Sequence, residues 1–399
     1  MASLRETDEK RVAHRGFSSG RFAPTLYAGR MPDLAACDAY LAEHAGTLYA
    51  ELTRERPLRA EELVYAAAER VPELLPTRER VAAEAGKLQK DKAGLEIAQG
   101  LLLGHVLARP DSGAHLVETM LRPTELALQH LDELREHGRV DLGAAVVERR
   151  GNVGVLEMRN PRHLNAEDDT TLPASEAAAD LILLDPEIEV GVLRGGVVDH
   201  PRYAGRRILG AGLNLTHLYR GQISYLFFPV RDLGFLNKIH RGDKLWIAAA
   251  ETYAIGGACQ LLLTVDHIIA EPDCRLTLPA RNEGIIPGAA NLRLPRFVGD
   301  RAARRAILSG EELDLHAMAD EIVPREEMDA AIEARAAALA SAGAVSGAAN
   351  RRAFRVAQEP LDTFRAYMAV YAREQAQCYF SPALIRNLEQ NWRAHERAA

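Results

Sequence analysis

Two short glycine-bearing segments carry the residue pattern of an oxyanion-binding site. Ala211-Gly212-Leu213 and Ile255-Gly256-Gly257 each stand where an apolar, strand-like stretch ends. Glycine lets the main chain turn sharply there, so that N–H groups point into a cleft. Two N–H donors that face one point stabilise the negative oxygen of an enolate or of a tetrahedral thioester intermediate, and a helix that starts after the second segment adds its positive end. The alternative interpretation is a pair of ordinary tight β-to-α turns.

Motifs of several other enzyme classes are missing from the sequence. Gly210-Ala211-Gly212-Leu213-Asn214-Leu215 begins like a dinucleotide-binding loop, but Leu215 stands where a third glycine is needed. No GxxxxGK[ST] or HExxH motif occurs, and the histidines and carboxylates lack metal-ligand spacing. We therefore expect no metal and no tightly bound organic cofactor.

Composition narrows the class of protein further. The 399 residues are 47% hydrophobic and 26% charged, which is typical of a chain that buries a large core. Lys and Arg number 49 against 56 Asp and Glu, a net charge of −7 that argues against a nucleic-acid-binding surface. No stretch approaches the roughly 18 apolar residues of a membrane span, and the polar first residues do not resemble a signal peptide. The four cysteines, Cys37, Cys259, Cys274 and Cys378, are scattered without a CxxC pair, so we expect free thiols in a cytoplasmic protein.

The elements that must position the two glycine-bearing segments change in character along the chain. Residues 1–30 lack periodicity and predict a flexible arm. Over 31–145, apolar residues recur every three or four positions between prolines, which predicts an all-helical N-terminal domain. Over 146–325, short apolar runs alternate with helical stretches, the pattern of βαβ units in an α/β core. Residues 326–399 are helical again and suit oligomer contacts.

A series of further motifs runs through the predicted core in a fixed order. Around the two glycine-bearing segments the chain reads Arg159-Asn160-Pro161, Leu164-Asn165-Ala166, Leu193-Arg194-Gly195-Gly196, Gly284-Ile285-Ile286-Pro287-Gly288-Ala289 and Leu308-Ser309-Gly310. This series resembles the crotonase (enoyl-CoA hydratase/isomerase) superfamily over residues 146–325. The resemblance implies a crotonase-like spiral of ββα turns, an acyl-CoA thioester substrate, and homotrimers or hexamers formed as dimers of trimers. It also implies an oxyanion hole made by the N–H groups of Leu213 and Gly257.

Two departures from the superfamily pattern argue against simple hydration. Hydratases of this superfamily carry two catalytic glutamates, and the matching positions here are Gln260 and Ala280. A hydratase needs one carboxylate to activate water and another to protonate the α-carbon, and an amide and a methyl group do neither. Glu283, three residues after Ala280, is either a base or a structural residue of its loop.

The sequence around these motifs resembles one branch of the superfamily, the cofactor-independent dioxygenases of dihydroxyphenylacetyl-CoA. The resemblance rests on the helical N-terminal region and on HLNAED (163–168), DHPRYAGRR (199–207), GAGLNLTHL (210–218), GGACQLLL (256–263) and EGIIPGAANLRL (283–294). It implies conversion of 3,5-dihydroxyphenylacetyl-CoA and O2 to 3,5-dihydroxyphenylglyoxylate and CoA, in dihydroxyphenylglycine formation for glycopeptide antibiotics. The connection between Arg231 and Trp246 is shorter than this branch leads us to expect.

The candidate site combines residues from the motifs with residues that the resemblance implies. The candidate catalytic residues are Leu213, Gly257, Gln260, Glu167 and Arg231, and the candidate substrate-binding and CoA-binding residues are Arg162, His163, His200, Ala211, Gly212, Asn214, Leu215, Gly256, Ala258, Ile286 and Gln377. Arg231 is expected to pair with Glu167 or with a phenolate, and His200 to border the aromatic ring. For each of these residues an ordinary loop or surface side chain is the alternative.

Two other functions remain open from the sequence. One is a thioester hydrolase or isomerase of the same superfamily that uses Glu283 or Glu167 as base. The other is a non-catalytic acyl-CoA-binding subunit whose helical domain binds a partner.

Overall fold

Helices make up the first part of the chain. The computed structural model describes residues 33–396, so the predicted arm over residues 1–30 lies outside the described residues. The helices are α1 (Leu34–Leu52), α2 (Ala60–Arg70), α3 (Arg78–Ala82), η2 (Gln89–Asp91), α4 (Ile97–Ala108), α5 (Pro110–Met120) and α6 (Glu125–His137). Asp33 caps α1 by accepting from the N–H groups of Ala35 and Ala36, and Gly138 ends α6 in the left-handed conformation, φ 70°. The predicted boundary at residue 145 falls at the first residue of strand β2.

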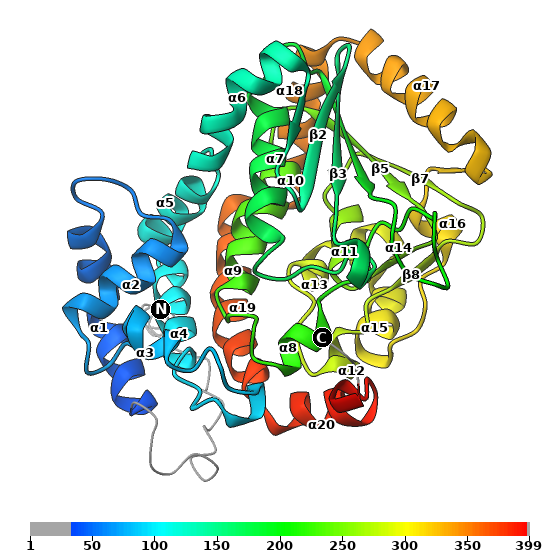
Figure 1. The fold of residues 1–399 in the computed structure, drawn as a ribbon. Helices are drawn as coiled ribbons and strands as arrows, with labels where there is room; N and C mark the ends of the chain where they lie inside the picture. Colours follow the sequence, from blue (N-terminus) through cyan, green and yellow to red (C-terminus); the bar gives the residue numbers. More distant parts are fainter. Residues whose placement is uncertain (1–32, 397–399) are drawn as a thin grey trace, which may run out of the picture. The chain divides into compact units, whose positions relative to one another are not determined.

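A mixed sheet of seven strands follows (Figure 1). Its order is β1 (Arg139–Asp141), β2 (Ala145–Arg150), β3 (Val153–Met158), β4 (Val190–Gly195), β5 (Leu245–Ala250), β7 (His267–Ala270) and β9 (Glu321–Ile322). The first three strands pair antiparallel, and β3, β4, β5, β7 and β9 pair parallel. A second, two-stranded parallel sheet joins β6 (Tyr253–Ile255) to β8 (Arg275–Thr277). Strands linked by helical crossovers confirm the predicted α/β class.

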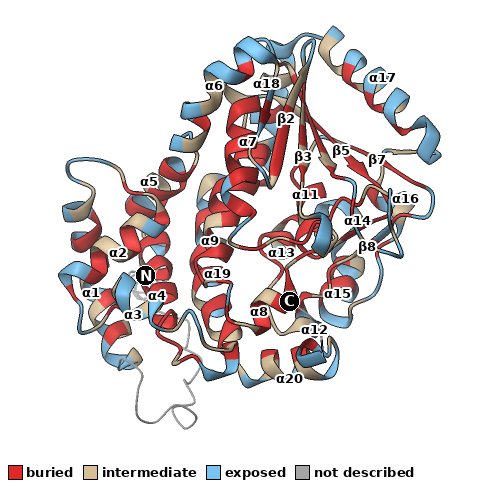
Figure 2. Ribbon diagram, in the orientation of Figure 1, coloured by how far each residue is buried: buried red, intermediate tan, exposed pale blue. Residues whose placement is uncertain are grey.

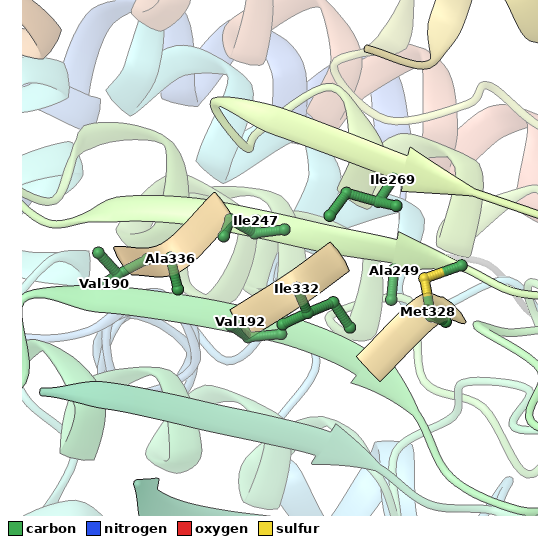
Figure 3. Close-up of a cluster of buried hydrophobic side chains, with 8 residues drawn as sticks. All are labelled: Val190, Val192, Ile247, Ala249, Ile269, Met328, Ile332 and Ala336. Atoms are coloured by element: carbon green, nitrogen blue, oxygen red, sulfur yellow. The ribbon is translucent and has the colours of Figure 1, made fainter. Parts of the chain in front are cut away.

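Helices cover both faces of the large sheet. Val190, Val192, Ile247, Ala249 and Ile269 point to one face, where they meet Met328, Ile332 and Ala336 of α17 (Met328–Ser341), as Figure 3 shows. Val153 and Val155 of β3 also pack on this face. Because side chains alternate between the two faces of a strand, Gly154 belongs to the opposite face, where it lies against Ile182 of α7 (Leu172–Leu184). Both faces of the parallel strands are therefore buried.

The C-terminal helices pack against the N-terminal helices. After α18 (Ala344–Gln358), helix α19 (Leu361–Tyr379) lies along α4, and α20 (Pro382–Gln390) follows (Figure 1). Gly100 and Gly104 of α4 make this approach possible, because an added Cβ on Gly100 would lie 2.5 Å from the Cβ of Ala376. Figure 2 shows that α4 is largely buried, whereas α19 combines buried and exposed residues. Residues 33–396 belong to one compact unit. Within that range, none of the helices has the length and apolar composition of a membrane-spanning segment.

The remaining helices are mostly short, and some of them border the candidate site. They are η3 (Pro161–His163), α8 (Leu215–Tyr219), α9 (Phe227–Arg231), η4 (Asp232–Leu236), α10 (Asn237–Arg241), α11 (Gly257–Leu262), α12 (Ala280–Glu283), α13 (Ala290–Arg293), α14 (Pro295–Val298), α15 (Asp300–Ser309), α16 (Leu315–Met318), η5 (Arg325–Glu327) and η6 (Ala394–Glu396). The prediction of a strand before Leu213 is wrong. Gly210 pairs with Ala254 and Leu213 pairs with Glu167, but each pair is an isolated bridge and neither Gly210 nor Leu213 is part of a strand.

Candidate active site

The two glycine-bearing segments lie against each other at the centre of the candidate site. Gly212 has φ 80° and Gly256 has φ 54°, backbone conformations that favour glycine. A Cβ on Gly212 would lie 2.9 Å from the carbonyl oxygen of Ile255, and a Cβ on Gly256 would lie 3.5 Å from the Cα of Gly212. Glycine is therefore required at position 212 both for its dihedral angle and for this close approach.

The N–H groups of Leu213 and Gly257 are free of the local main-chain pairing. Glu167 donates its N–H to Gly212 O at 2.7 Å and accepts from the N–H of Asn214 at 2.9 Å. In this parallel bridge the N–H of Leu213 points away from Glu167. Gly257 is the first residue of α11, so its N–H has no carbonyl partner within the helix. Both residues border one pocket, which is the arrangement of an oxyanion hole.

This active-site pocket combines main-chain donors with apolar and ionisable side chains. It is lined by Glu167, Leu213, Phe227, Phe228, Arg231, Asp232, Gly256, Gly257, Gln260, Ala280, Glu283, Ile285, Ile286, Gly288 and Tyr371. Its free volume is about 30 Å³, room for about two water-sized molecules. The pocket thus brings together all five candidate catalytic residues.

Arg231 is the centre of a buried hydrogen-bond network. Its Nε and Nη2 donate to the two carboxylate oxygens of Glu167, both at 2.9 Å, so the predicted pairing is present. Nη2 also donates to Gly257 O at 2.8 Å, and Nη1 donates to Gln260 Oε1 at 2.9 Å. Burial opposes the charge of Arg231, but Glu167 and Asp232 hold the pKa of the guanidinium above its usual range. The ion pair is therefore a fixed structural unit of the pocket wall.

Gly257 lies directly against this ion pair. A Cβ at position 257 would lie 1.9 Å from Glu167 Oε2 and 2.9 Å from Arg231 Nη2. Any larger residue would have to displace the carboxylate. Gly257, a candidate oxyanion donor, and the ion pair are for this reason positioned together.

Gln260 and Ala280 occupy the positions of the missing hydratase glutamates. Because Gln260 Oε1 accepts from Arg231, its amide nitrogen is the end left to donate into the pocket. Ala280 is buried and contributes a methyl group. An amide and a methyl group lack the carboxylate that a hydratase needs at these two positions.

Glu283 is a half-buried carboxyl group in the wall of the same pocket. Burial raises the pKa of Glu283 to about 7, because the charged form loses solvation. No neighbouring charge or hydrogen bond contributes to this shift. The carboxyl group is thus able to exchange a proton near neutral pH.

Several predicted substrate-binding residues have structural roles. Asn214 caps α8, where it accepts from the N–H of His217 at 3.2 Å, and donates to Asp168 at 3.0 Å. Ala258 is buried beside Gly210. Ala211 packs in the apolar cluster around Ile208, and Leu215 is the first residue of α8.

The remaining predicted residues lie outside the described lining of the active-site pocket. Arg162 is exposed on η3, and the ring of His163 lies 5.0 Å from that of His217. His200 lies 5.7 Å from the ring of Tyr203 and accepts from the N–H of Arg202. Gln377 lies on α19 but does not border the pocket within the described part of the chain.

The sequence motifs did not single out four of the lining residues. Phe227 and Phe228 come from α9, Asp232 follows Arg231, and Tyr371 comes from α19. On the same helix, Gln375 accepts from the N–H of Ile286 at 2.8 Å. A residue of the C-terminal helices carries no local signal of its place in the site, because the packing of α19 against α4 decides it.

Fold and site together define the class of protein. The family described as enoyl-CoA hydratase/isomerase matches residues 148–377, and the chain belongs to this family. Its crystal-structure neighbours include enoyl-CoA hydratases of Mycobacterium avium subsp. paratuberculosis (TM-score 0.53, 18% identity, 62% of this chain and 99% of that chain) and of Bacillus halodurans (0.53, 17%, 62% and 99%). These similarities concern the fold, and they confirm the predicted crotonase-like core.

One relative is similar over far more than the core. The (3,5-dihydroxyphenyl)acetyl-CoA 1,2-dioxygenase of Amycolatopsis orientalis is 48% identical over 362 residues, covering 86% of this chain and 83% of the relative. By comparison, the short-chain-enoyl-CoA hydratase of Clostridium acetobutylicum is 28% identical over 180 residues, covering 44% and 64%. The resemblance to the dioxygenase branch is confirmed.

Proposed function

We propose that this protein is a dioxygenase that converts (3,5-dihydroxyphenyl)acetyl-CoA and O2 to 3,5-dihydroxyphenylglyoxylate and CoA. The similarity to the Amycolatopsis enzyme extends through the helices at both ends of the core. The single observation that carries the proposal is the replacement of both hydratase glutamates, with Gln260 hydrogen-bonded to the Arg231–Glu167 pair. The pocket keeps the oxyanion donors of the family and lacks its water-activating carboxylates.

The first part of the reaction makes the substrate an electron donor. O2 is a triplet and reacts slowly with closed-shell molecules, so an oxygenase without a cofactor needs an electron-rich substrate. Loss of the α-proton from an arylacetyl thioester gives an enolate that is conjugated with the dihydroxyphenyl ring. The N–H groups of Leu213 and Gly257 stabilise the enolate oxygen.

The second part incorporates both oxygen atoms. The carbanion transfers an electron to O2, and the two radicals combine as a peroxide on the α-carbon. The peroxide oxygen attacks the thioester carbonyl and expels the CoA thiolate. Cleavage of the O–O bond with loss of the second α-proton leaves one oxygen atom on each carbon, and the thiolate takes up one proton to give CoA.

The network around Arg231 positions the reacting groups. Glu167 accepts from Arg231 through both oxygens and has lone pairs left for a phenol of the substrate. The Gln260 amide nitrogen donates to the peroxide or to a ring hydroxyl without protonating the carbanion. Ala280, Ile285 and Ile286 contribute apolar surface, which suits O2 and excludes water.

The proposal extends to cofactor, assembly and location. The reaction as written needs no metal or flavin, and among residues 33–396 no group of three or more His, Cys, Asp or Glu is placed to hold a metal ion. We propose a homotrimer or hexamer, in line with the sequence resemblance. The four cysteines are unpaired, which supports a cytoplasmic location for an enzyme of antibiotic biosynthesis.

Substrate-dependent O2 uptake tests the proposed function. Purified protein treated with chelator and given (3,5-dihydroxyphenyl)acetyl-CoA should consume one O2 for each thiol released. Removal of O2 should stop thiol release. Undiminished thiol release without O2 would instead indicate a hydrolase, and the absence of any turnover in air would favour a non-catalytic acyl-CoA-binding subunit.

A further inference from the structure

The proposed reaction needs a base that removes the α-proton of the substrate. The active-site pocket holds four groups that exchange protons: Glu167, Asp232, Glu283 and Tyr371. A base for this step needs a free lone pair within the pocket and a pKa near the working pH. These two requirements separate the four groups.

Three of the four groups are poorly suited to the task. Both oxygens of Glu167 accept from Arg231, so protonating Glu167 would break a buried ion pair. Asp232 accepts from the N–H of Ala289 at 2.9 Å and lies 3.9 Å from Arg231. Burial holds the pKa of the Tyr371 phenol well above its usual range, so this phenol stays protonated.

Glu283 differs from the other carboxyl groups by its lack of partners. It ends α12 beside Gly284, whose φ of 96° turns the chain towards Ile285 and Ile286 of the pocket wall. Burial is the cause of its raised pKa, and no hydrogen bond or charge of a residue within 33–396 adds to it. A half-buried, unpaired carboxyl group in the wall of a pocket has no stabilising role that is evident from its contacts.

We propose that Glu283 is the catalytic base that removes the α-proton of the thioester substrate, an inference that rests on the proposed function. The α C–H bond breaks, its proton moves to a carboxylate oxygen of Glu283, and the electron pair becomes the enolate. The enolate oxygen is held by the N–H groups of Leu213 and Gly257. The base and the oxyanion donors border the same pocket, so proton removal and charge stabilisation take place together.

The pH dependence follows from the charge state of Glu283. Two helices contact α12, and both carry charged groups: Asp300, Arg301, Arg304 and Arg305 on α15, and Arg386 and Glu389 on α20. Arg281 lies on α12 itself. The groups that face the pocket are Glu167, Arg231, Asp232 and Tyr371. The pKa of Glu283 is raised to about 7 by burial, and none of these groups contributes to the shift. Because the base must be ionised, the rate of proton removal should fall as the pH drops through 7.

Hydrogen exchange at the α-carbon tests this step apart from oxygenation. Under anaerobic conditions in D2O, the wild-type protein should exchange the α-protons of (3,5-dihydroxyphenyl)acetyl-CoA, measured by mass spectrometry of the recovered thioester. Glu283→Gln should slow this exchange by about 100-fold or more. The exchange rate of this variant should no longer fall as the pH drops through 7. Glu136→Gln, on an exposed face of α6, is the matched control and should behave like wild type.

The outcomes separate the two proposals. Exchange by Glu283→Gln at the wild-type rate would overturn the assignment of the base, even if the wild-type protein consumes O2. If exchange depends on Glu283 but the wild-type protein never consumes O2, the assignment of Glu283 as base stands and the proposed dioxygenase function is overturned. If Glu283→Gln does not fold, Glu283→Asp is the second variant, because it retains a carboxylate on a side chain one methylene shorter. It should exchange the α-protons slowly, and its rate should still fall at low pH. Exchange by Glu283→Asp at the wild-type rate counts against the proposal.

Discussion

At the scale of single residues, the pocket is organised around the buried charge of Arg231 and its partners. Four hydrogen bonds join the Arg231 guanidinium to Glu167, Gly257 and Gln260. Loss of one partner from a buried ion pair typically costs about 3–5 kcal/mol, because the other charge stays buried. The network therefore fixes the geometry of the pocket more than it adds to net stability.

Gln260→Glu tests whether the amide protects the carbanion. The replacement keeps an acceptor for Arg231 Nη1 but introduces a group that can carry a proton. We expect protonation of the carbanion to compete with its capture by O2, with α-carbon exchange in D2O rising by about tenfold relative to O2 uptake. Simultaneous measurement of O2 uptake, thiol release and exchange checks this.

The control for Gln260→Glu is the same change at Gln222, which is exposed. Gln222→Glu should leave the coupling of O2 uptake to thiol release unchanged. Equal coupling in the wild-type protein and Gln260→Glu would contradict the role assigned to this amide.

At the scale of elements, the contact between α4 and α19 links the N-terminal helices to the active-site pocket. Gly100 and Gly104 let α19 approach the backbone of α4, with Ala372 O only 2.8 Å from a Cβ placed on Gly100. Tyr371 and Gln375 of α19 then reach the active-site pocket and the loop at Ile286. A helix that lacks catalytic motifs thus completes the site.

Gly100→Ala should weaken this helix contact. The added methyl group meets Ala376 and the main chain of Ala372, and overpacking of this kind costs about 1–3 kcal/mol. We expect a lower free energy of unfolding in urea and a lower kcat, because Tyr371 and Gln375 shift with α19. Gly86→Ala is the control, since a Cβ at position 86 meets nothing within 4 Å; similar losses in both variants would argue against the contact as the cause.

Much of the element structure was predictable, and the reasons are physical. The short apolar runs predicted within residues 146–325 include β3, β4 and β7, because strands buried on both faces are nearly continuous in hydrophobicity. Strands such as β9, with two residues, are too short to leave a pattern. Glycines identified the two loops of the site, whereas Tyr371 and Asp232 enter it through packing that no local pattern records.

At the scale of the whole molecule, the described surface leaves apolar side chains uncovered on one helix. On α18, Val345 is 83% exposed, Phe354 is 56% exposed and Val356 is 75% exposed. Val345 and Val356 share one face of α18, whereas Phe354 lies towards the opposite face. Exposed apolar residues on a helix face often mark a contact with another chain. Helix α18 lies within residues 326–399, and the oligomer contacts expected of that segment stay a prediction.

Sedimentation of the purified protein tests the assembly. The chain has a mass of 43.7 kDa, and we expect a particle of three or six chains. Phe354→Glu combined with Val356→Glu should shift the particle to a single chain, whereas Leu128→Glu on α6, also at an exposed apolar position, should not. A wild-type monomer would contradict the prediction.

The pairing of α4 with α19 also sets the order of events during synthesis. Gln89 donates to Tyr379 O across 290 residues, and Arg365 donates to Leu107 O across 258 residues. A ribosome that adds about 5–20 residues per second therefore exposes α4 for many seconds before α19 emerges. During that interval the surface of α4 at Gly100 and Gly104 lacks its native cover, and transiently exposed apolar surface of this kind is prone to aggregation.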